Sequence, residues 1–187
     1  MLVLQTTLAM DAGTSRTRLV ERVFRLRVLG LALGFFAIAG VLLDHGAPPW
    51  AWTLLGIDAF LWPHLARQFA LHGTDPERAE INNLLIDSAM GGVWIALMHF
   101  SVVPSALLLV MLAIDKISVG GWRLLGHAFA LQVAACAMTA AINNFAFEPE
   151  TSMRATLLAL PFLAGYPMAI AAATFAFAQR ANRHNRM

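Results

Sequence analysis

The chain contains few charged residues and almost no cysteine. Only 13% of its 187 residues are charged, which is about half the share in an ordinary soluble domain. A protein of 20.3 kDa needs more polar surface than this to remain in water, so the composition excludes a soluble globular domain. The single cysteine cannot form a disulfide within the chain, which excludes a disulfide-bonded scaffold.

The motifs of soluble enzymes are also missing. The sequence has no glycine-rich phosphate loop, no paired-cysteine zinc pattern, no HExxH motif and no nucleophile elbow. We therefore predict no catalytic residue and no cofactor. The arginines are accounted for by membrane orientation, as described below, and we expect no nucleic-acid partner.

Apolar residues are abundant, at 59% of the chain with a mean hydropathy of +0.66. In hydrocarbon every backbone polar group must be paired internally, so a membrane span is a helix of about 20 mostly apolar residues. The sequence therefore predicts an all-α fold, an integral membrane bundle of six transmembrane helices in contact with the lipid bilayer. The predicted spans are residues 26–43, 50–66, 81–98, 104–117, 122–142 and 155–178.

Turn-forming residues separate these spans. Pro49 is placed for the first turn of the second helix, and Asp75 is placed to cap the third. The pair Gly120-Gly121 separates the fourth and fifth spans, and Thr151 or Ser152 can cap the sixth. The connections are short, so consecutive helices are expected to be antiparallel neighbours.

The basic residues predict the orientation of the bundle. Twelve of the thirteen belong to the termini and the even-numbered loops, which makes that side cytoplasmic, with both termini on it. They are Arg16, Arg18, Arg22, Arg25, Arg27, Arg67, Arg78, Lys116, Arg123, Arg180, Arg183 and Arg186. The bundle, residues 26–178, then lies between a basic cytoplasmic segment, residues 1–25, and a short cytoplasmic linker, residues 179–187.

The basic N-terminal segment has two interpretations. Residues 17–27 carry apolar side chains on one helical face and arginines towards the other, which is typical of an amphipathic helix lying on an anionic membrane surface. Alternatively, the first span begins early and has a positively charged flank. Both interpretations place the N-terminus in the cytoplasm.

Ionisable residues inside the predicted spans are the candidate functional residues, because each is costly in lipid unless it is sheltered. One interpretation is a polar pocket that binds a ligand, an ion or a proton. The other is a set of structural ion pairs, in which Asp87 or Asp115 pairs with Arg123. No basic residue shares the depth of Asp58, so we expect it to be protonated or hydrogen-bonded to another helix. The candidates for sensing are His64, Asp87, Asp115, Arg123, His127 and Asp58.

Several polar residues have simpler interpretations. His64 and His127 share a depth on different helices, as a haem or metal site with two histidines would require, but nothing else in the sequence supports such a site. Lys116 is long enough to reach the interface with its charge. His45 and His99 are expected to be solvated loop residues on the outer side.

Small residues form stripes along two spans, which allows close helix packing within the chain or between the subunits of a dimer. These residues are Gly30, Gly34, Gly165, Ala169 and Ala173.

Four segments resemble the second membrane-associated sensor family of bacteria, with matching order and spacing from about residue 16 to residue 180. They are residues 25–30 (RLRVLG), 60–64 (FLWPH), 83–88 (NLLIDS) with 91–94 (GGVW), and 115–123 (DKISVGGWR). The resemblance implies a sensor module in the bacterial inner membrane. It also implies a cytoplasmic GGDEF or class III cyclase output domain and, since these output domains work as dimers, a homodimer. The family's characteristic polar positions correspond here to His64, Asp87, Asp115 and Arg123.

The chain departs from that family at its end, nine residues after the sixth predicted span. Because no cyclase domain follows, we expect no enzymatic activity from these residues. They are then either a truncated sensor or one that works with a separate partner. The alternative function is a proton-coupled or solute transporter that uses Asp58 and Asp87, although the two halves of the chain share no motif. A membrane-embedded enzyme would need a nucleophile or metal set that the sequence lacks.

Overall fold

The computed structural model describes residues 2–184, with side chains described for residues 20–172 and for Phe175. The described part of the chain is helical and contains no strand, which confirms the predicted all-α fold. Its elements are α1 (Leu2–Asp44), α2 (Pro49–Gly56), the π-helix η1 (Ile57–Leu61), α3 (Trp62–His72), α4 (Pro76–Leu97), α5 (Val102–Ile142) and α6 (Met153–His184).

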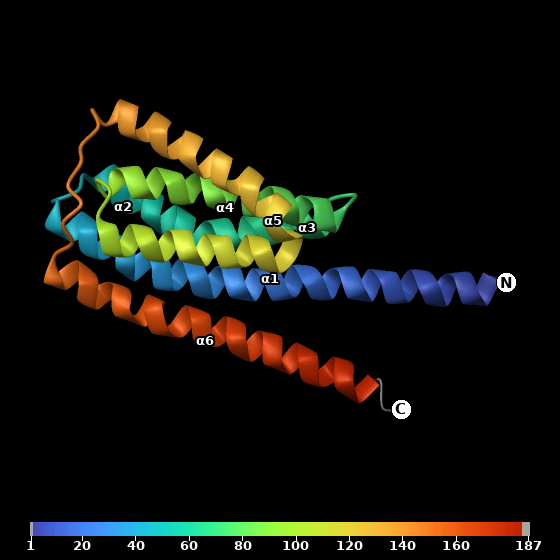
Figure 1. Ribbon diagram of the computed structural model, residues 1–187. Coiled ribbons are helices and arrows are strands. Elements are labelled where there is room, and N and C mark those ends of the chain that lie inside the picture. The colour runs from blue at the N-terminus through green and yellow to red at the C-terminus, as the bar shows by residue number, and fades with distance from the viewer. Residues whose placement is uncertain (1, 185–187) are drawn as a thin grey trace.

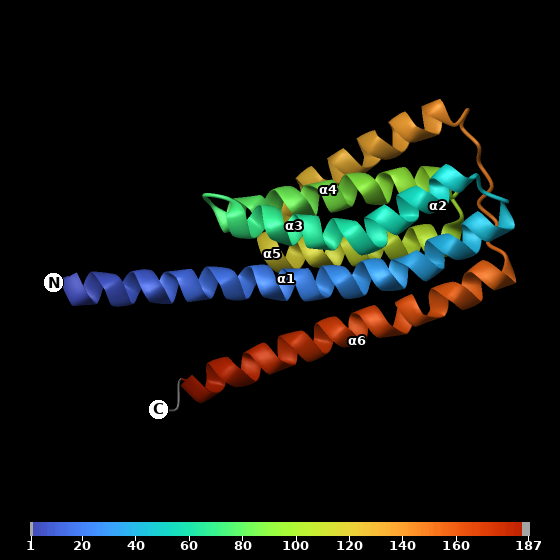
Figure 2. The same cartoon turned by 180° about the vertical axis from the view of Figure 1, so that it is seen from behind.

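The helices lie roughly along one direction and form a bundle with two ends (Figure 1). Helix α6 lies beside α1 in both views, and both helices reach the end of the bundle at which the chain starts and finishes (Figure 2). We call this the terminal end; it also holds the α3–α4 turn. The opposite, distal end holds the α1–α2 turn, the α4–α5 turn and residues 143–152, which lead into α6.

Helix α5 consists of two helices that meet at a sharp kink. Gly121 has a φ of 64° and a ψ of −160°, a left-handed conformation that glycine adopts without steric cost. The chain reverses direction there and the second half of α5 splays away from the bundle (Figure 1). The break predicted at Gly120-Gly121 is confirmed.

Helix caps also agree with the sequence. The Asp75 side chain accepts hydrogen bonds from the backbone N–H groups of Glu77 and Arg78, both at 3.2 Å, and Pro76 opens α4. Ser152 accepts a hydrogen bond from Ala155 N at 3.0 Å at the start of α6. These caps satisfy backbone donors that have no partner within the helix.

The prediction of six membrane-spanning helices is supported only in part. Among the described residues, three helical segments are long and apolar enough to cross a membrane: Val20–Asp44, Val102–Ile142 and Met153–Ala172. The second predicted span lies within three shorter elements, α2, η1 and α3, which have 8, 5 and 11 residues. The third, α4, contains Glu77, Arg78, Glu80 and Asp87. The fourth and fifth form the two halves of α5.

The predicted domain limits do not coincide with breaks in the backbone. Helix α1 runs continuously through residues 25 and 26, so the basic segment and the first apolar span share one helix. Helix α6 likewise continues through residues 178 and 179 to His184.

The glycine stripes pack within the chain. A Cβ atom at Gly30 would lie 2.9 Å from Met111 Sδ, and one at Gly165 would lie 3.3 Å from a methyl carbon of Leu33. One at Gly34 would be in ordinary contact with Leu108. Helix α1 can therefore approach α5 and α6 closely. Ala169 is half-buried in the same region of α6, and the side chain of Ala173 lies outside the described residues.

Candidate functional site: a buried polar cluster

The site begins with the buried face of α1. Val20, Val23, Arg27 and Gly30 follow one another at intervals of three or four residues, and all four are buried. This spacing places them on a single helical face. Arg27 therefore points into the bundle with 5% of its surface exposed.

Helix α4 supplies the carboxylates that meet this arginine. Arg27 Nη2 donates to Glu80 Oε2 and Arg27 Nε donates to Asp87 Oδ2, both at 3.0 Å. Glu80 and Asp87 are seven residues apart, so they lie on the same side of α4. Opposite charges at this distance away from water attract strongly, and each depends on the other for its stability there.

Two tryptophan–aspartate hydrogen bonds join the run of η1 and α3 to α4. Trp62 Nε1 donates to Asp87 Oδ1 at 2.6 Å, and Trp94 Nε1 donates to Asp58 Oδ2 at 2.7 Å. The run of η1 and α3 contributes Asp58 and Trp62, and α4 contributes Asp87 and Trp94. The hydrogen bond that was expected to tie Asp58 to another helix is present.

Helices α5 and α6 complete the cluster. The hydroxyl of Tyr166 on α6 donates to Asp115 Oδ1 on α5. The adjacent Lys116 is fully buried, and its Nζ has no hydrogen-bond partner among the described residues. The expectation that Lys116 reaches the interface is wrong, because its ammonium lies in the protein interior.

We call this arrangement the polar cluster. It brings together five charged side chains and two aromatic hydrogen-bond donors from α1, α3, α4, α5 and α6. Its members are Arg27, Trp62, Glu80, Asp87, Asp115, Lys116 and Tyr166.

A cavity of about 210 Å³ adjoins the polar cluster. Arg27, Glu80, Asp87 and Asp115 line it together with Arg22. Within the described part of the chain, Arg27 Nη1 and Glu80 Oε1 are buried without a hydrogen-bond partner. Buried polar atoms normally have partners, so two walls of the cavity have unused hydrogen-bonding capacity.

The charges define what the polar cluster can do chemically. The polar cluster contains three carboxyl groups but only two basic groups, one guanidinium and one amine, so its acidic groups outnumber its basic groups by one. A proton, a cation or a hydrogen-bond donor that enters the cavity would change which of these groups pair. A change in the partners of Asp115 would alter its hydrogen bond with Tyr166, which connects α5 to α6.

Other predicted residues lie outside the polar cluster. His64, Arg123 and His127 are all exposed, and the ring of His64 packs beside Phe24 with centroids 5.4 Å apart. The arginine that pairs with Asp87 is Arg27, from the first helix, and not Arg123. Among the described residues, the group of three side chains that could hold a metal ion is His45, His99 and Glu148, and it includes neither His64 nor His127.

Sequence reasoning missed Arg27, Glu80, Trp62 and Tyr166 as parts of the site. Arg27 was grouped with the arginines that orient the chain, and Glu80 lies one residue before the predicted third span. A usable signal was the seven-residue spacing from Val20 to Arg27 and from Glu80 to Asp87, which marks a buried helical face.

Comparison with known proteins finds one similar family and two similar relatives. The family model of the MASE2 domain matches residues 22–111, a range that includes Arg27, Glu80 and Asp87. Two relatives are probable diguanylate cyclases DgcC, one from Escherichia coli strain K12 and one from Escherichia coli O6:H1 strain CFT073. Each is 33% identical over 172 residues, covering 92% of this chain and 46% of the relative.

The chain thus spans about half the length of the curated relatives that it matches. No solved structure matches it significantly. The family match and the similarity to these relatives confirm the resemblance found in the four sequence segments. Residues 22–111 thus match the MASE2 domain, and this similarity supports a membrane sensory module over a transporter.

Proposed function

We propose that this module detects a change at the bacterial inner membrane and transmits it through α6 to a cytoplasmic output domain that synthesises a cyclic nucleotide. The output domain is of the GGDEF or class III cyclase type, in the same chain or in a separate partner. The two relatives named as probable diguanylate cyclases favour the GGDEF type. Catalysis then belongs to the output domain.

The proposed orientation rests on two observations. The first residues of α1 and the last residues of α6 lie at the same end of the bundle (Figure 1). A segment that continues α6 would therefore emerge on the side of the N-terminus. Eleven of the thirteen basic residues belong to described segments on this side. Positively charged flanks remain in the cytoplasm, which places the terminal end there. Counting the two halves of α5 separately, the chain then crosses the membrane six times.

The observation that carries the proposal is the link between the polar cluster and α6. Tyr166 is the residue through which α6 contacts Asp115, while Arg27, Glu80 and Asp87 join α1 to α4 beside the same cavity. A stimulus that favours one pairing of these groups shifts α6 only as far as its affinities for the two arrangements differ. In a homodimer, shifts of two α6 helices would change how the output domains meet.

The test is a chimera in which the full chain is joined to a diguanylate cyclase domain and produced in bacterial membranes. Tyr166→Phe removes the hydroxyl that binds Asp115 and keeps the ring. We expect cyclic di-GMP formation per molecule of membrane protein to change by about 5-fold or more, the lower range of allosteric coupling. Phe162→Leu is a matched control, because Phe162 is a buried aromatic residue one turn away on α6 without a polar contact to the cluster.

A second variant protects the test from a packing artefact. Asp115→Asn leaves the side chain nearly unchanged in size and should alter activity to a similar extent, because it changes the same hydrogen bond. If both variants retain the parental activity at equal membrane levels, the polar cluster is structural and the proposed mechanism is wrong.

A further inference from the structure

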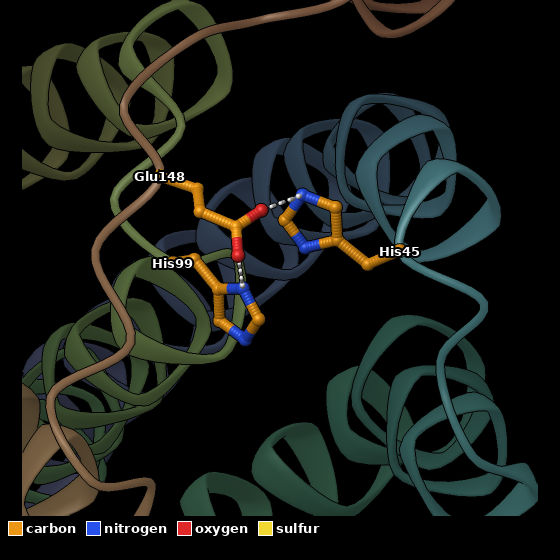
Figure 3. Close-up of side chains that lie close together, drawn as sticks. All are labelled: His45, His99 and Glu148. Atoms are coloured by element: carbon orange, nitrogen blue, oxygen red, sulfur yellow. Dashed lines mark ion pairs between the residues drawn. The ribbon is translucent and has the colours of Figure 1, made fainter.

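A second group of polar side chains lies at the distal end, far from the polar cluster. His45 follows α1, His99 follows α4, and Glu148 belongs to the connection that leads to α6, so three separate connections meet here (Figure 3). The backbone N–H of Glu148 donates to the carbonyl oxygen of His99 at 2.8 Å, which fixes these two residues side by side.

The side chains converge without forming hydrogen bonds. Glu148 Oε2 lies 3.6 Å from His45 Nε2, and Glu148 Oε1 lies 3.8 Å from His99 Nδ1. Hydrogen bonds of this type are about 2.7–3.2 Å long. One ligand atom from each residue lies within 4.8 Å of the others. Two ligand atoms on a tetrahedral metal ion, with bonds of about 2.0–2.2 Å, are separated by roughly 3.4 Å, which is close to the 3.6 and 3.8 Å between these side chains.

The histidine rings have unused nitrogen atoms. Nδ1 of His45 and Nδ1 of His99 are both buried and without a hydrogen-bond partner among the described residues. The two rings stack with centroids 4.6 Å apart and an interplanar angle of 27°. Two protonated rings in this position would repel each other, whereas neutral rings offer lone pairs to an electrophile.

The surroundings favour a cation. Asp44, Glu148 and Glu150 outnumber Arg154 among the charged residues in these connections and at the adjoining helix ends.

We propose that His45, His99 and Glu148 bind a divalent transition-metal ion of the zinc class at the distal end of the bundle. Two imidazoles and one carboxylate leave a coordination position for water or a further ligand. Imidazole ligands favour zinc, copper and nickel over magnesium and calcium, which prefer sites made of oxygen atoms.

The bound metal would join the α1–α2 turn, the α4–α5 turn and the connection to α6. It would thereby fix the start of α6, the helix that runs to the terminal end, relative to α1 and α4. This inference concerns binding alone and does not depend on the proposed role in signalling.

The test uses the full chain, purified in detergent with a tag free of histidine and stripped of metal with a chelator. Zn²⁺ is titrated in competition with a chromogenic zinc indicator. We expect one Zn²⁺ per chain. We also expect His45→Gln and Glu148→Gln each to weaken binding by more than about 100-fold, since loss of an outer-shell partner alone costs about 10–100-fold. His72→Gln, at an exposed histidine near the terminal end, is the matched control and should bind as the parent chain does.

The third ligand requires a different substitution. His99 has a φ of 51°, which asparagine tolerates better than most residues, so His99→Asn removes the imidazole with little backbone strain. Electron paramagnetic resonance with Cu²⁺ as the probe should report two coordinating imidazole nitrogens in the parent chain and one in His99→Asn. Glu148 is largely exposed, so Glu148→Gln tests the site even where a histidine variant fails to fold.

Three results would overturn the proposal: no stoichiometric Zn²⁺ binding by the parent chain, undiminished binding by the folded variants, or an equal loss in His72→Gln. Since binding is measured directly, a negative result here leaves the cyclase chimera unaffected. An unresponsive chimera likewise leaves the metal site unaffected.

Discussion

The two ends of the bundle hold their polar groups in opposite ways. Towards the terminal end, Arg27, Glu80 and Asp87 lie in the interior, and the ion pairs join residues 53 and 60 positions apart at 3.0 Å. At the distal end, the ion pair of Arg154 with Asp44 is 3.4 Å long and the arginine side chain is 64% exposed. The distal connections are also held by backbone hydrogen bonds, such as Val102 N to the Pro149 carbonyl oxygen at 3.0 Å.

This difference shows where a change in pairing can have a large effect. Solvent replaces a lost partner at the distal surface, so breaking an ion pair there costs little. In the interior a lost partner leaves an isolated charge, and the remaining groups must rearrange. A change of pairing in the polar cluster therefore alters the energy of the molecule more than the same change at the distal surface does.

The largest expected effect comes from removing the central cation. Arg27→Ala leaves Glu80 and Asp87 buried without their common partner, so we expect the free energy of unfolding to fall by about 3–5 kcal/mol. Unfolding of the purified chain by SDS in mixed micelles measures this loss. Arg25→Ala is the matched control, because Arg25 is exposed and its ion pair among the described side chains is a long contact of 3.8 Å with Glu21. Equal losses in the two variants would remove the distinction between interior and surface charges.

An intermediate effect is expected between the two ends. Trp94→Phe keeps an aromatic ring but removes the indole N–H that binds Asp58, so a buried carboxyl group loses its donor. We expect a loss of about 1–3 kcal/mol in the same measurement. Trp122→Phe serves as the control, because Trp122 is 76% exposed. A negligible loss in Trp94→Phe would mean that a water in the adjoining cavity of about 20 Å³ replaces the indole.

The smallest effect is expected at the distal surface. Arg154→Ala removes the partner of Asp44, while Ser152 still donates its hydroxyl to that carboxylate. We expect a loss of about 0–1 kcal/mol. A loss comparable with that of Arg27→Ala would show that the distal connections also depend on charge pairing.

The sequence contained enough information for the helices and their breaks. Pro49, Asp75, Gly121 and Ser152 act through local backbone chemistry, which depends on a few neighbouring residues. The buried aspartates were recognisable for a similar reason, because a charge within an apolar run is visible in a single segment. Prediction of membrane passes was less successful where a helix also carries several charged residues, as in α4.

The partners of those aspartates could not be predicted from depth along the membrane alone. The predicted depth of Arg123 in the membrane is similar to that of Asp87, which suggested that the two residues pair. Which groups meet, however, is decided by the direction in which each side chain points from its helix. Arg27 faces the bundle whereas Arg123 faces outward. The π-helix was also invisible, since residues 57–61 have no composition that distinguishes them from an α-helix.

That π-helix has a consequence for how the chain tolerates changes in length. The N–H of Trp62 bonds to the carbonyl of Ile57, five residues back, so this turn holds one residue more than an α-helical turn. Deleting one residue between positions 57 and 61 would leave a regular α-helix in the same phase, because the π-turn accommodates the extra residue within a single turn. Asp58 and Trp62 would then be three residues apart and would still lie on one helical face. The π-turn therefore lets this segment carry one additional residue while both tryptophan–aspartate pairs form along one helix interface.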